Sequence, residues 1–320
     1  MNHQDKLNSA FQVAHKYYVR NMKTEHIANE MNVSRSTVSR LLSFAKDEGL
    51  VNIHIIDPNE EPSRIEKEIL DRFSLKKIHV IPVHGSDGEH EWLQRVAQYA
   101  AIHLNTLFDS NMTLGIAWGT TISAISNYLL KKTTNNSRIV QLNGAGNTRT
   151  MGIEYASEII KIFSNNYQAH AYHFPLPTFF DSAETKKLLW QERSIKSILS
   201  IQNKADILLF SIGAVNSGIP SHVHSDGYLG RKEYLELEKL DVVGDIATVF
   251  FKSNGDYKNI PLNERASGPE LSFFRDKHSI CVVSGLAKVK GLFAALKGQY
   301  IKELIVDEPT ALELVRTCLS

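Results

Sequence analysis

Short apolar runs alternate with helix-like segments along most of this chain, and that alternation constrains the fold more than any other feature. Each run is too short for a buried helix, and amphipathic segments with helical spacing lie between the runs. Such an order favours βαβ units, in which a mainly parallel sheet is covered by helices. The sequence therefore predicts a large Rossmann-like α/β domain, whose strands we assign to KKIHVIP, TLGIAW, RIVQL, DILLFSIG, DIATVFF, SICVV and ELIVD.

The start of the chain follows a different pattern. Residues 1–56 contain helical patterns and then LVNIHII, which alternates like a strand. The stretch DPNEEPS at 57–63 is polar, carries two prolines and three acids, and makes a natural boundary. We therefore expect a small domain over residues 1–56 and a larger one over residues 57–320.

Composition limits the classes of protein that fit. A chain of 320 residues that is 42% hydrophobic can bury a sizeable core, and its length suggests two domains. The net charge of +1 excludes a basic nucleic-acid coat, so any DNA contact must come from a local patch. The two cysteines, Cys281 and Cys318, lack metal-ligand spacing and are expected to be free thiols in a reducing compartment. The polar N-terminus and the absence of a long apolar run predict a cytoplasmic protein with no membrane partner.

The first domain has the pattern of a helix-turn-helix. DKLNSAFQVAHKYYVR reads as an amphipathic helix that includes Phe11 on its apolar face. TEHIANEMN is a second, short helix, and Asn32 takes the turn, where a residue tolerant of positive φ is needed. A third helix begins with Ser34 as its N-cap and ends at Gly49. The residues expected to pack inward are Ile27, Ala28, Val33, Val38, Leu41 and Leu42.

The start of this third helix is a candidate DNA reader. Arginine bonds guanine bidentately, hydroxyl side chains reach phosphates or bases, and a helix N-terminus favours a phosphate. The alternative is an ordinary capped surface helix with solvated polar residues. The outward residues that we predict to contact DNA are Ser34, Arg35, Ser36, Thr37, Ser39 and Arg40.

In the second domain, glycine-containing loops follow several predicted strands. Ligands bind at the carboxyl ends of parallel strands, and glycine lets backbone N–H groups approach an anion closely. These loops are residues 119–121, 143–146 with Arg149 shortly after, 214–218, and 284–288 with Lys288 near a helix start. Any single loop reads equally well as a plain turn, but together they predict a polar crevice suited to a phosphate.

Other groups of polar residues carry less weight. His222, His224 and Asp226 have metal-like spacing, but they lie in a stretch rich in glycine, serine and proline, so we interpret them as a loop. His170 flanks an apparent strand and reads as structural. Asp245 is either an acceptor for a sugar hydroxyl or a sheet-end residue, and the second interpretation is preferred. We expect no metal and no cofactor.

The ordered set of motifs resembles the SorC family of sugar-responsive bacterial transcriptional regulators. The match rests on HIANEMNVSRSTVSRLLSFAKDEGLVNIHI, LGIAWGTT, IVQLNGAG, FPLP, DILLFSIGAV, VVGDI and SGLAKVKGLFAALKGQYIKELIVDEPTALELV, and it runs over nearly the whole chain. The resemblance implies a winged-helix-like DNA-binding domain and an effector domain similar to sugar-phosphate isomerases and CoA transferases. It also implies a dimer or tetramer, double-stranded operator DNA as partner, and a phosphorylated sugar or polyol as effector.

The resemblance also implies roles for particular residues. Gly119, Thr120 and Thr121 would hold the phosphate, Asn143 and Gly144 would line the pocket, and Lys288 would pair with the ligand. The loop at 143–146 departs from the glycine pair that is frequent in the family, and this leaves the identity of the sugar open.

Two functions fit these observations. The first is a regulator of a carbohydrate-catabolism operon, and the second is a sugar-phosphate isomerase or deacylase with an N-terminal extension. An isomerase needs a placed general base in the crevice, and no loop offers an obvious one, although Asp226 and Glu308 stay open for that role. The regulator also explains the helix-turn-helix, so we favour a non-enzymatic regulator.

Overall fold

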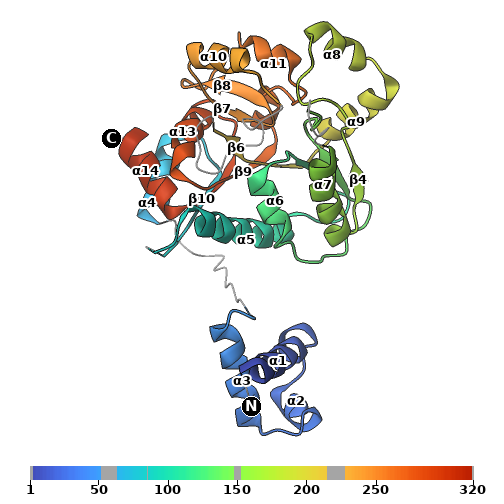
Figure 1. The fold of residues 1–320 in the computed structure, drawn as a ribbon, viewed down its shortest axis with the longest axis vertical. Coiled ribbons are helices and arrows are strands. Elements are labelled where there is room, and N and C mark those ends of the chain that lie inside the picture. Colours follow the sequence, from blue (N-terminus) through green and yellow to red (C-terminus); the bar gives the residue numbers. More distant parts are fainter. Residues whose placement is uncertain (1–2, 52–62, 85, 148–152, 215–227, 319–320) are drawn as a thin grey trace. The chain divides into compact units, whose positions relative to one another are not determined.

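The computed structural model describes residues 3–51, 63–84, 86–147, 153–214 and 228–318 (Figure 1). The chain separates into two compact units, Met1–Glu61 and Pro62–Ser320. The predicted domain boundary between residues 56 and 57 lies outside the described residues, as does most of the strand predicted at 50–56.

The N-terminal unit is helical. It contains α1 (His3–Ala14), the π-helical turn η1 (His15–Val19), α2 (Thr24–Glu30) and α3 (Arg35–Asp47). The predicted inward residues are confirmed: Ile27, Ala28, Val38 and Leu41 are buried, with Val33 and Leu42 packed at the edge of that core. Phe11 is a wrong assignment, because α1 turns its smaller residues Ala10, Val13 and Ala14 inward and leaves Phe11 58% exposed.

The predicted signals at the ends of α3 are confirmed. Asn32 has φ of 52°, the left-handed conformation that its turn requires. The Ser34 hydroxyl caps α3 by accepting a hydrogen bond from Thr37 N at 3.1 Å. Gly49, just past the helix, has φ of 72°, as expected of a glycine that ends a helix. Local chemistry therefore fixes both ends of this helix.

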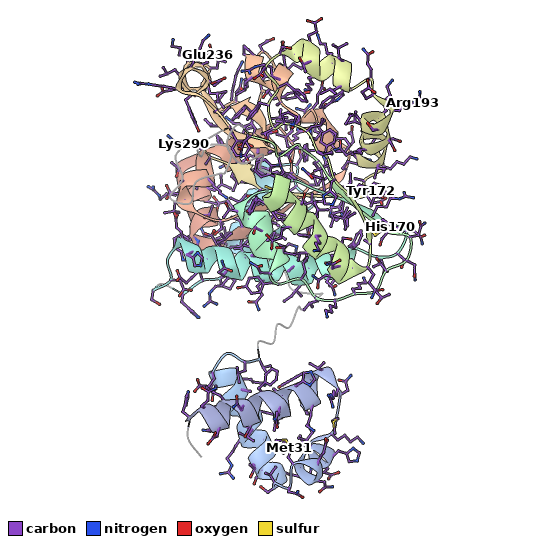
Figure 2. All side chains as sticks on the ribbon, turned by 45° about the vertical axis from the view of Figure 1, so that its right-hand side comes forward. Met31, His170, Tyr172, Arg193, Glu236 and Lys290 are labelled. Carbon is purple, nitrogen blue, oxygen red and sulfur yellow. The ribbon has the colours of Figure 1, made fainter. Side chains whose placement is uncertain are left out.

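The second unit is built on a seven-stranded sheet whose paired strands all run parallel. In spatial order the strands are β1 (Lys77–Ile81), β10 (Glu303–Asp307), β9 (His278–Val283), β5 (Ile207–Phe210), β2 (Thr113–Ile116), β3 (Arg138–Gln141) and β4 (His170–Tyr172). The edge strand β4 begins at His170, whose side chain is exposed (Figure 2). The predicted mainly parallel α/β sheet is confirmed.

Helices bury both faces of this sheet, which explains why its strands read as continuous apolar runs. Along β9, Ile280 and Val282 belong to one core and Cys281 and Val283 to the other, as strand alternation requires. The first core includes residues of α5 (Glu89–Leu107), α6 (Thr120–Ser126) and α7 (Ile153–Tyr167). The second includes residues of α4 (Arg64–Arg72), α12 (Ser272–Arg275), α13 (Val289–Lys297) and α14 (Glu308–Cys318).

A second, three-stranded sheet was not predicted. It pairs β6 (Ile212–Gly213), β7 (Val242–Ile246) and β8 (Val249–Lys252) in antiparallel fashion. DIATVFF is therefore a hairpin, and the assignment of one parallel strand to it is wrong. Its turn residues Ala247 and Thr248 both have positive φ, 47° and 70°, although neither is the glycine or asparagine that usually marks such a turn.

Further helices complete this unit. They are α8 (Ala183–Leu189), α9 (Arg193–Asn203), α10 (Arg231–Lys239) and α11 (Pro261–Arg265), together with the 3-10 turn η3 (Leu286–Lys288). Figure 1 shows α10 and α11 beside the small sheet. Among the described residues, no helix combines the length and the apolar character that crossing a bilayer requires.

Candidate functional site

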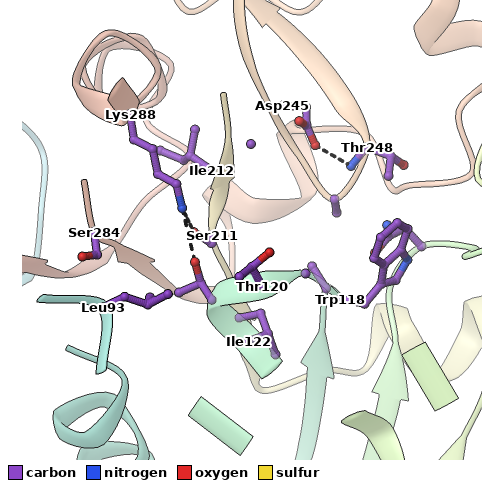
Figure 3. A pocket seen from close by; sticks show the side chains of 16 residues that line it. Leu93, Trp118, Thr120, Ile122, Ser211, Ile212, Asp245, Thr248, Ser284 and Lys288 are labelled. Atoms are coloured by element: carbon purple, nitrogen blue, oxygen red, sulfur yellow. Dashed lines mark hydrogen bonds between the residues drawn. The ribbon is translucent and has the colours of Figure 1, made fainter. Parts of the chain in front are cut away.

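A pocket opens at the carboxyl ends of the central strands, where the three-stranded sheet meets them (Figure 3). The space between its walls amounts to about 650 Å³, a figure that includes open solvent. Its lining comes from predicted loops and from the small sheet. The lining residues are Leu93, Ala117, Trp118, Gly119, Thr120, Thr121, Ile122, Asn143, Ser211, Ile212, Gly213, Asp245, Ala247, Thr248, Ser284 and Lys288.

Lys288 is the cation of this pocket. Its ammonium group donates to Thr121 Oγ1 at 3.2 Å and to Ser211 Oγ at 3.4 Å (Figure 3). Burial lowers the pKa of Lys288, and the nearby carboxylates of Asp245, Asp307 and Glu89 offset only part of this effect. The positive charge of Lys288 is therefore only partly compensated by protein groups. An anion bound in the pocket would supply the missing compensation.

The segment that carries Lys288 is held by the end of β10. Gly285, with φ of 107°, donates its N–H to Asp307 Oδ2 at 3.1 Å and to Thr310 Oγ1 at 3.0 Å. The other oxygen of Asp307 accepts from Thr310 N at 2.8 Å. Asp307 is fully buried, so its carboxylate locks the loop after β9 onto the start of α14.

Other buried polar atoms face the same pocket. Asn143 Oδ1, Thr248 Oγ1 and Ser284 Oγ have no hydrogen-bond partner among the described protein groups. Asp245 is 4% exposed, and its Oδ2 accepts from Thr248 N at 3.1 Å. A buried polar atom without a partner costs free energy, so these groups favour a ligand rich in hydroxyls.

Thr248 and Ser211 line the pocket and were missed by the sequence interpretation, whereas Asp245 was considered there as an acceptor for a sugar hydroxyl but not preferred in that role. Asp245 was assigned to a sheet end, and it instead lines the pocket because β7 belongs to the small sheet. The useful signal would have been a hairpin within DIATVFF, but Ala247 and Thr248 give no turn signature.

Among the predicted effector residues, Gly119, Thr120, Thr121, Asn143 and Lys288 come together around the pocket. Gly144 is not among the described lining residues. Its N–H donates to Ser267 Oγ at 2.9 Å, and its carbonyl accepts from Trp118 Nε1 at 3.0 Å and from Thr178 Oγ1 at 3.1 Å. Gly144 therefore helps to position the pocket residue Trp118 and does not itself line the pocket.

Several predicted residues lie outside the described part of the chain. These are Arg149, His222, His224 and Asp226, together with most of the loop at 214–218. Cys281 is a free, buried thiol, as predicted. Burial raises its pKa well above the ordinary thiol value, so it stays protonated beside Lys288.

The candidate DNA-reading residues lie on an exposed surface at the start of α3. Ser34, Arg35, Ser36, Ser39 and Arg40 are exposed, and Thr37 is half-buried. Arg35 Nη1 is bonded to Glu25 Oε1 at 2.6 Å. Arg40 Nε donates to Ser36 O at 3.4 Å, while the Ser34 hydroxyl lies 2.7 Å from that of Ser36 and 2.8 Å from that of Thr37. Both arginines therefore have intramolecular hydrogen-bond partners.

Known proteins share both the sequence and the fold. Residues 57–316 match a family model described as "Putative sugar-binding domain". The chain is 32% identical over 314 residues to the deoxyribonucleoside regulator of Bacillus subtilis (strain 168), covering 97% of this chain and 98% of that protein. It is 26% identical over 317 residues to the sorbitol operon regulator of Klebsiella pneumoniae, covering 97% and 98%.

Solved structures agree with these matches. A crystallised domain of "a possible sugar-binding transcriptional regulator" from Arthrobacter aurescens TC1 is 43% identical, with a TM-score of 0.74, and covers 81% of this chain and 100% of that one. The full-length sorbitol operon regulator SorC from Klebsiella pneumoniae shares the fold, with a TM-score of 0.78 at 24% identity over 95% of this chain and 97% of that one. The chain therefore belongs to the sugar-binding domain family of SorC-type transcriptional regulators.

Proposed function

We propose that this protein is a DNA-binding transcriptional regulator of a carbohydrate-catabolism operon, controlled by a phosphorylated sugar or polyol in the pocket. The observation that supports the proposal is the partly desolvated Lys288 ammonium in a pocket where Asn143 Oδ1, Thr248 Oγ1 and Ser284 Oγ have no hydrogen-bond partner among the described protein groups. A cation at one end and free acceptors and hydroxyls at the other match a small molecule with a phosphate and several hydroxyls.

The phosphate belongs at the end of the pocket formed by Lys288 and residues 119–121. Gly119 has φ of 154° and carries no side chain, so a ligand can approach the backbone at the start of α6. The hydroxyls of Thr120 and Thr121 add donors there. The Lys288 ammonium now donates hydrogen bonds to Thr121 and Ser211. A phosphate dianion would accept hydrogen bonds from it and neutralise its charge.

The hydroxyl groups of the ligand belong at the opposite wall. Asp245 accepts hydrogen bonds, and Asn143 and Thr248 supply an acceptor and a hydroxyl, whereas Ser284 lies on the Lys288 side (Figure 3). A carboxylate is a poor neighbour for a phosphate and a good one for sugar hydroxyls, so the two walls orient the ligand in one direction.

Residues 1–56 act as the DNA-binding domain in this proposal, and residues 57–320 as the effector and oligomerisation domain. Arg35 and Arg40 read bases or phosphates in the major groove, with Ser34, Ser36, Thr37 and Ser39 around them. A single small reader binds DNA weakly, so a homo-oligomer supplies paired readers for two half-sites. The effector acts by shifting the populations of oligomer arrangements, by no more than its differential affinity for them.

A thermal-shift screen tests the effector. A panel of sugar and polyol phosphates, each matched with its dephosphorylated form, is added to the full chain. A true effector raises the melting temperature in proportion to the logarithm of its concentration above Kd, and the matched sugar does not. If no phosphorylated member stabilises the protein, the proposed ligand class is wrong.

A second experiment tests the DNA reader. Binding sites are selected from a randomised duplex library, and their affinities for wild type and Arg35→Ala are compared by fluorescence anisotropy. Loss of one bidentate contact costs about 1–3 kcal/mol and relaxes base preference at one position. Unchanged affinity and preference would exclude Arg35 as a reader.

An enzyme remains the second candidate because Asp245 places a carboxylate in the pocket, where an isomerase needs a base. The relatives are named as regulators. Product formation from any stabilising sugar phosphate, lost in Asp245→Asn, would favour the enzyme. Binding without turnover would favour the regulator.

A further inference from the structure

Three histidines converge on one glutamate at the amino-terminal end of the large sheet, the end opposite the pocket. Glu303 opens β10 and is 2% exposed. Its Oε1 lies 2.9 Å from His79 Nε2 in β1 and 2.6 Å from His103 Nε2 in α5. Its Oε2 lies 2.6 Å from His278 Nε2, at the start of β9. One carboxylate thus joins four elements of the fold.

The charge of this carboxylate needs a counter-charge. The polar side-chain atoms bonded to this buried carboxylate are the Nε2 atoms of His79, His103 and His278. Within the described residues, no lysine or arginine forms an ion pair with Glu303. A buried anion is stable only when a proton on an imidazole or another cation balances it.

The atoms around Glu303 are suited to a metal ion. Ligand atoms of His79, His103 and Glu303 lie within 4.8 Å of one another, so they can share one ion. Imidazole nitrogen and carboxylate oxygen bind Zn²⁺ at about 2.0–2.2 Å, which places tetrahedral ligands roughly 3.3 Å apart. The hydrogen-bonded pairs therefore need to separate by less than about 1 Å, and loss of the Nε2 protons accompanies this change.

Two residues next to these ligand atoms also suit a metal site. Tyr99 OH lies 2.8 Å from His79 Nδ1, so its oxygen can accept a hydrogen bond from Nδ1–H once Nε2 binds a metal. His278 contacts the carboxylate oxygen that His79 and His103 do not use, and it can orient the carboxylate. The side chain of His278 is 37% exposed, which gives an ion a route to the buried atoms.

We propose that His79, His103 and Glu303 form a binding site for a transition-metal ion of the Zn²⁺ type, with Tyr99 and His278 as outer partners. Three protein ligands leave a fourth position for water or for a rotated His278. The ion ties the outer strands β1 and β10 to α5, and its role is separate from that of the effector pocket.

The test uses the full chain without a histidine tag, treated with a chelator and then dialysed. Co²⁺ is titrated first because tetrahedral Co²⁺ absorbs visible light strongly, and Zn²⁺ is then used to displace it. The expected result is about one ion per chain and a rise in melting temperature with Zn²⁺. His103→Gln and His79→Gln should bind at least tenfold more weakly, and Tyr99→Phe about tenfold more weakly.

His170→Gln is the matched control, since His170 is exposed and outside the cluster. Equal binding by wild type and both ligand variants would overturn the proposal, as would wild type that takes up no stoichiometric Co²⁺ or Zn²⁺ at micromolar concentrations. If His103→Gln fails to fold, the wild-type Co²⁺ spectrum and His79→Gln decide the question. No sugar or DNA is needed, so failure here is distinct from failure of the proposed function.

Discussion

Replacement of Lys288 by methionine separates its role in ligand binding from its role in stability. Methionine keeps the apolar stem and removes the ammonium that donates to Thr121 and Ser211. Losing a close charged partner of a buried anion costs about 2–5 kcal/mol. Because Lys288 is half-buried and solvent screens part of the interaction, the lower part of that range applies, about 2–3 kcal/mol. At about 1.4 kcal/mol per factor of ten, the effector should bind about 30-fold to 150-fold more weakly.

The same substitution should slightly increase the unfolding free energy of the ligand-free protein or leave it almost unchanged. Burial already disfavours the charged form of Lys288, so an apolar side chain of similar length removes a desolvation cost. We expect the unfolding free energy of Lys288→Met to lie within about 1 kcal/mol of wild type. The thermal shift produced by the effector, by contrast, should shrink.

Isothermal titration calorimetry with the best ligand from the screen measures the first effect, and urea denaturation measures the second. Lys290→Met is the control, because Lys290 is an exposed lysine two positions along the chain (Figure 2). Equal effector affinity in Lys288→Met, Lys290→Met and wild type would refute the assignment of Lys288 as the anion partner. Unfolding of Lys288→Met would refute the desolvation argument.

Three other substitutions or conditions give distinct results. Burial lowers the pKa of Lys288 below 10.5, so Lys288 loses its proton as the pH rises from neutrality toward 10.5. The effector affinity of the wild type, measured by calorimetry, should therefore fall over this range. The affinity of Lys288→Met should depend less on pH. Gly144→Ala should destabilise the protein by about 1–3 kcal/mol or more in urea, because its Cβ would lie 2.4 Å from Leu176 O, whereas Gly88→Ala meets only a glutamate side chain. Ser34→Ala removes the cap of α3 and should lower the stability of the N-terminal unit by about 1 kcal/mol in hydrogen exchange.

Much of the fold could be predicted because buried parallel strands leave a strong signal. KKIHVIP, TLGIAW, RIVQL, SICVV and ELIVD each contain a strand of the large sheet. DILLFSIG contains two strands, since β5 and β6 join different sheets on either side of Ser211. DIATVFF misled the interpretation because its turn uses Ala247 and Thr248 at positive φ, without glycine or asparagine.

The residues of the candidate pocket also fall into those that the sequence predicted and those that it did not. Lys288 and residues 119–121 were found because they follow strands of the parallel sheet, where ligands collect. Thr248 was not found, and Asp245 was not preferred as a sugar-hydroxyl acceptor, because both reach the pocket from a sheet that the sequence did not reveal. Phe11 was predicted to be buried from its spacing in the sequence alone. Which face of α1 is buried depends on its packing against α3, and the sequence pattern does not show that contact.

The two walls of the pocket belong to separate sheets, and this separation has a consequence for how such regulators diversify. Lys288 and Thr121 follow strands of the large sheet, while Asp245 and Thr248 lie on the hairpin of β7 and β8. Asp245 and Thr248 face the pocket, whereas Ile246, Val249 and Phe251 of the same hairpin pack in one core with the parallel strands. Exchange of Asp245 and Thr248 between relatives should therefore change the preferred ligand while the anion-binding residues, Lys288 and Thr121, stay the same.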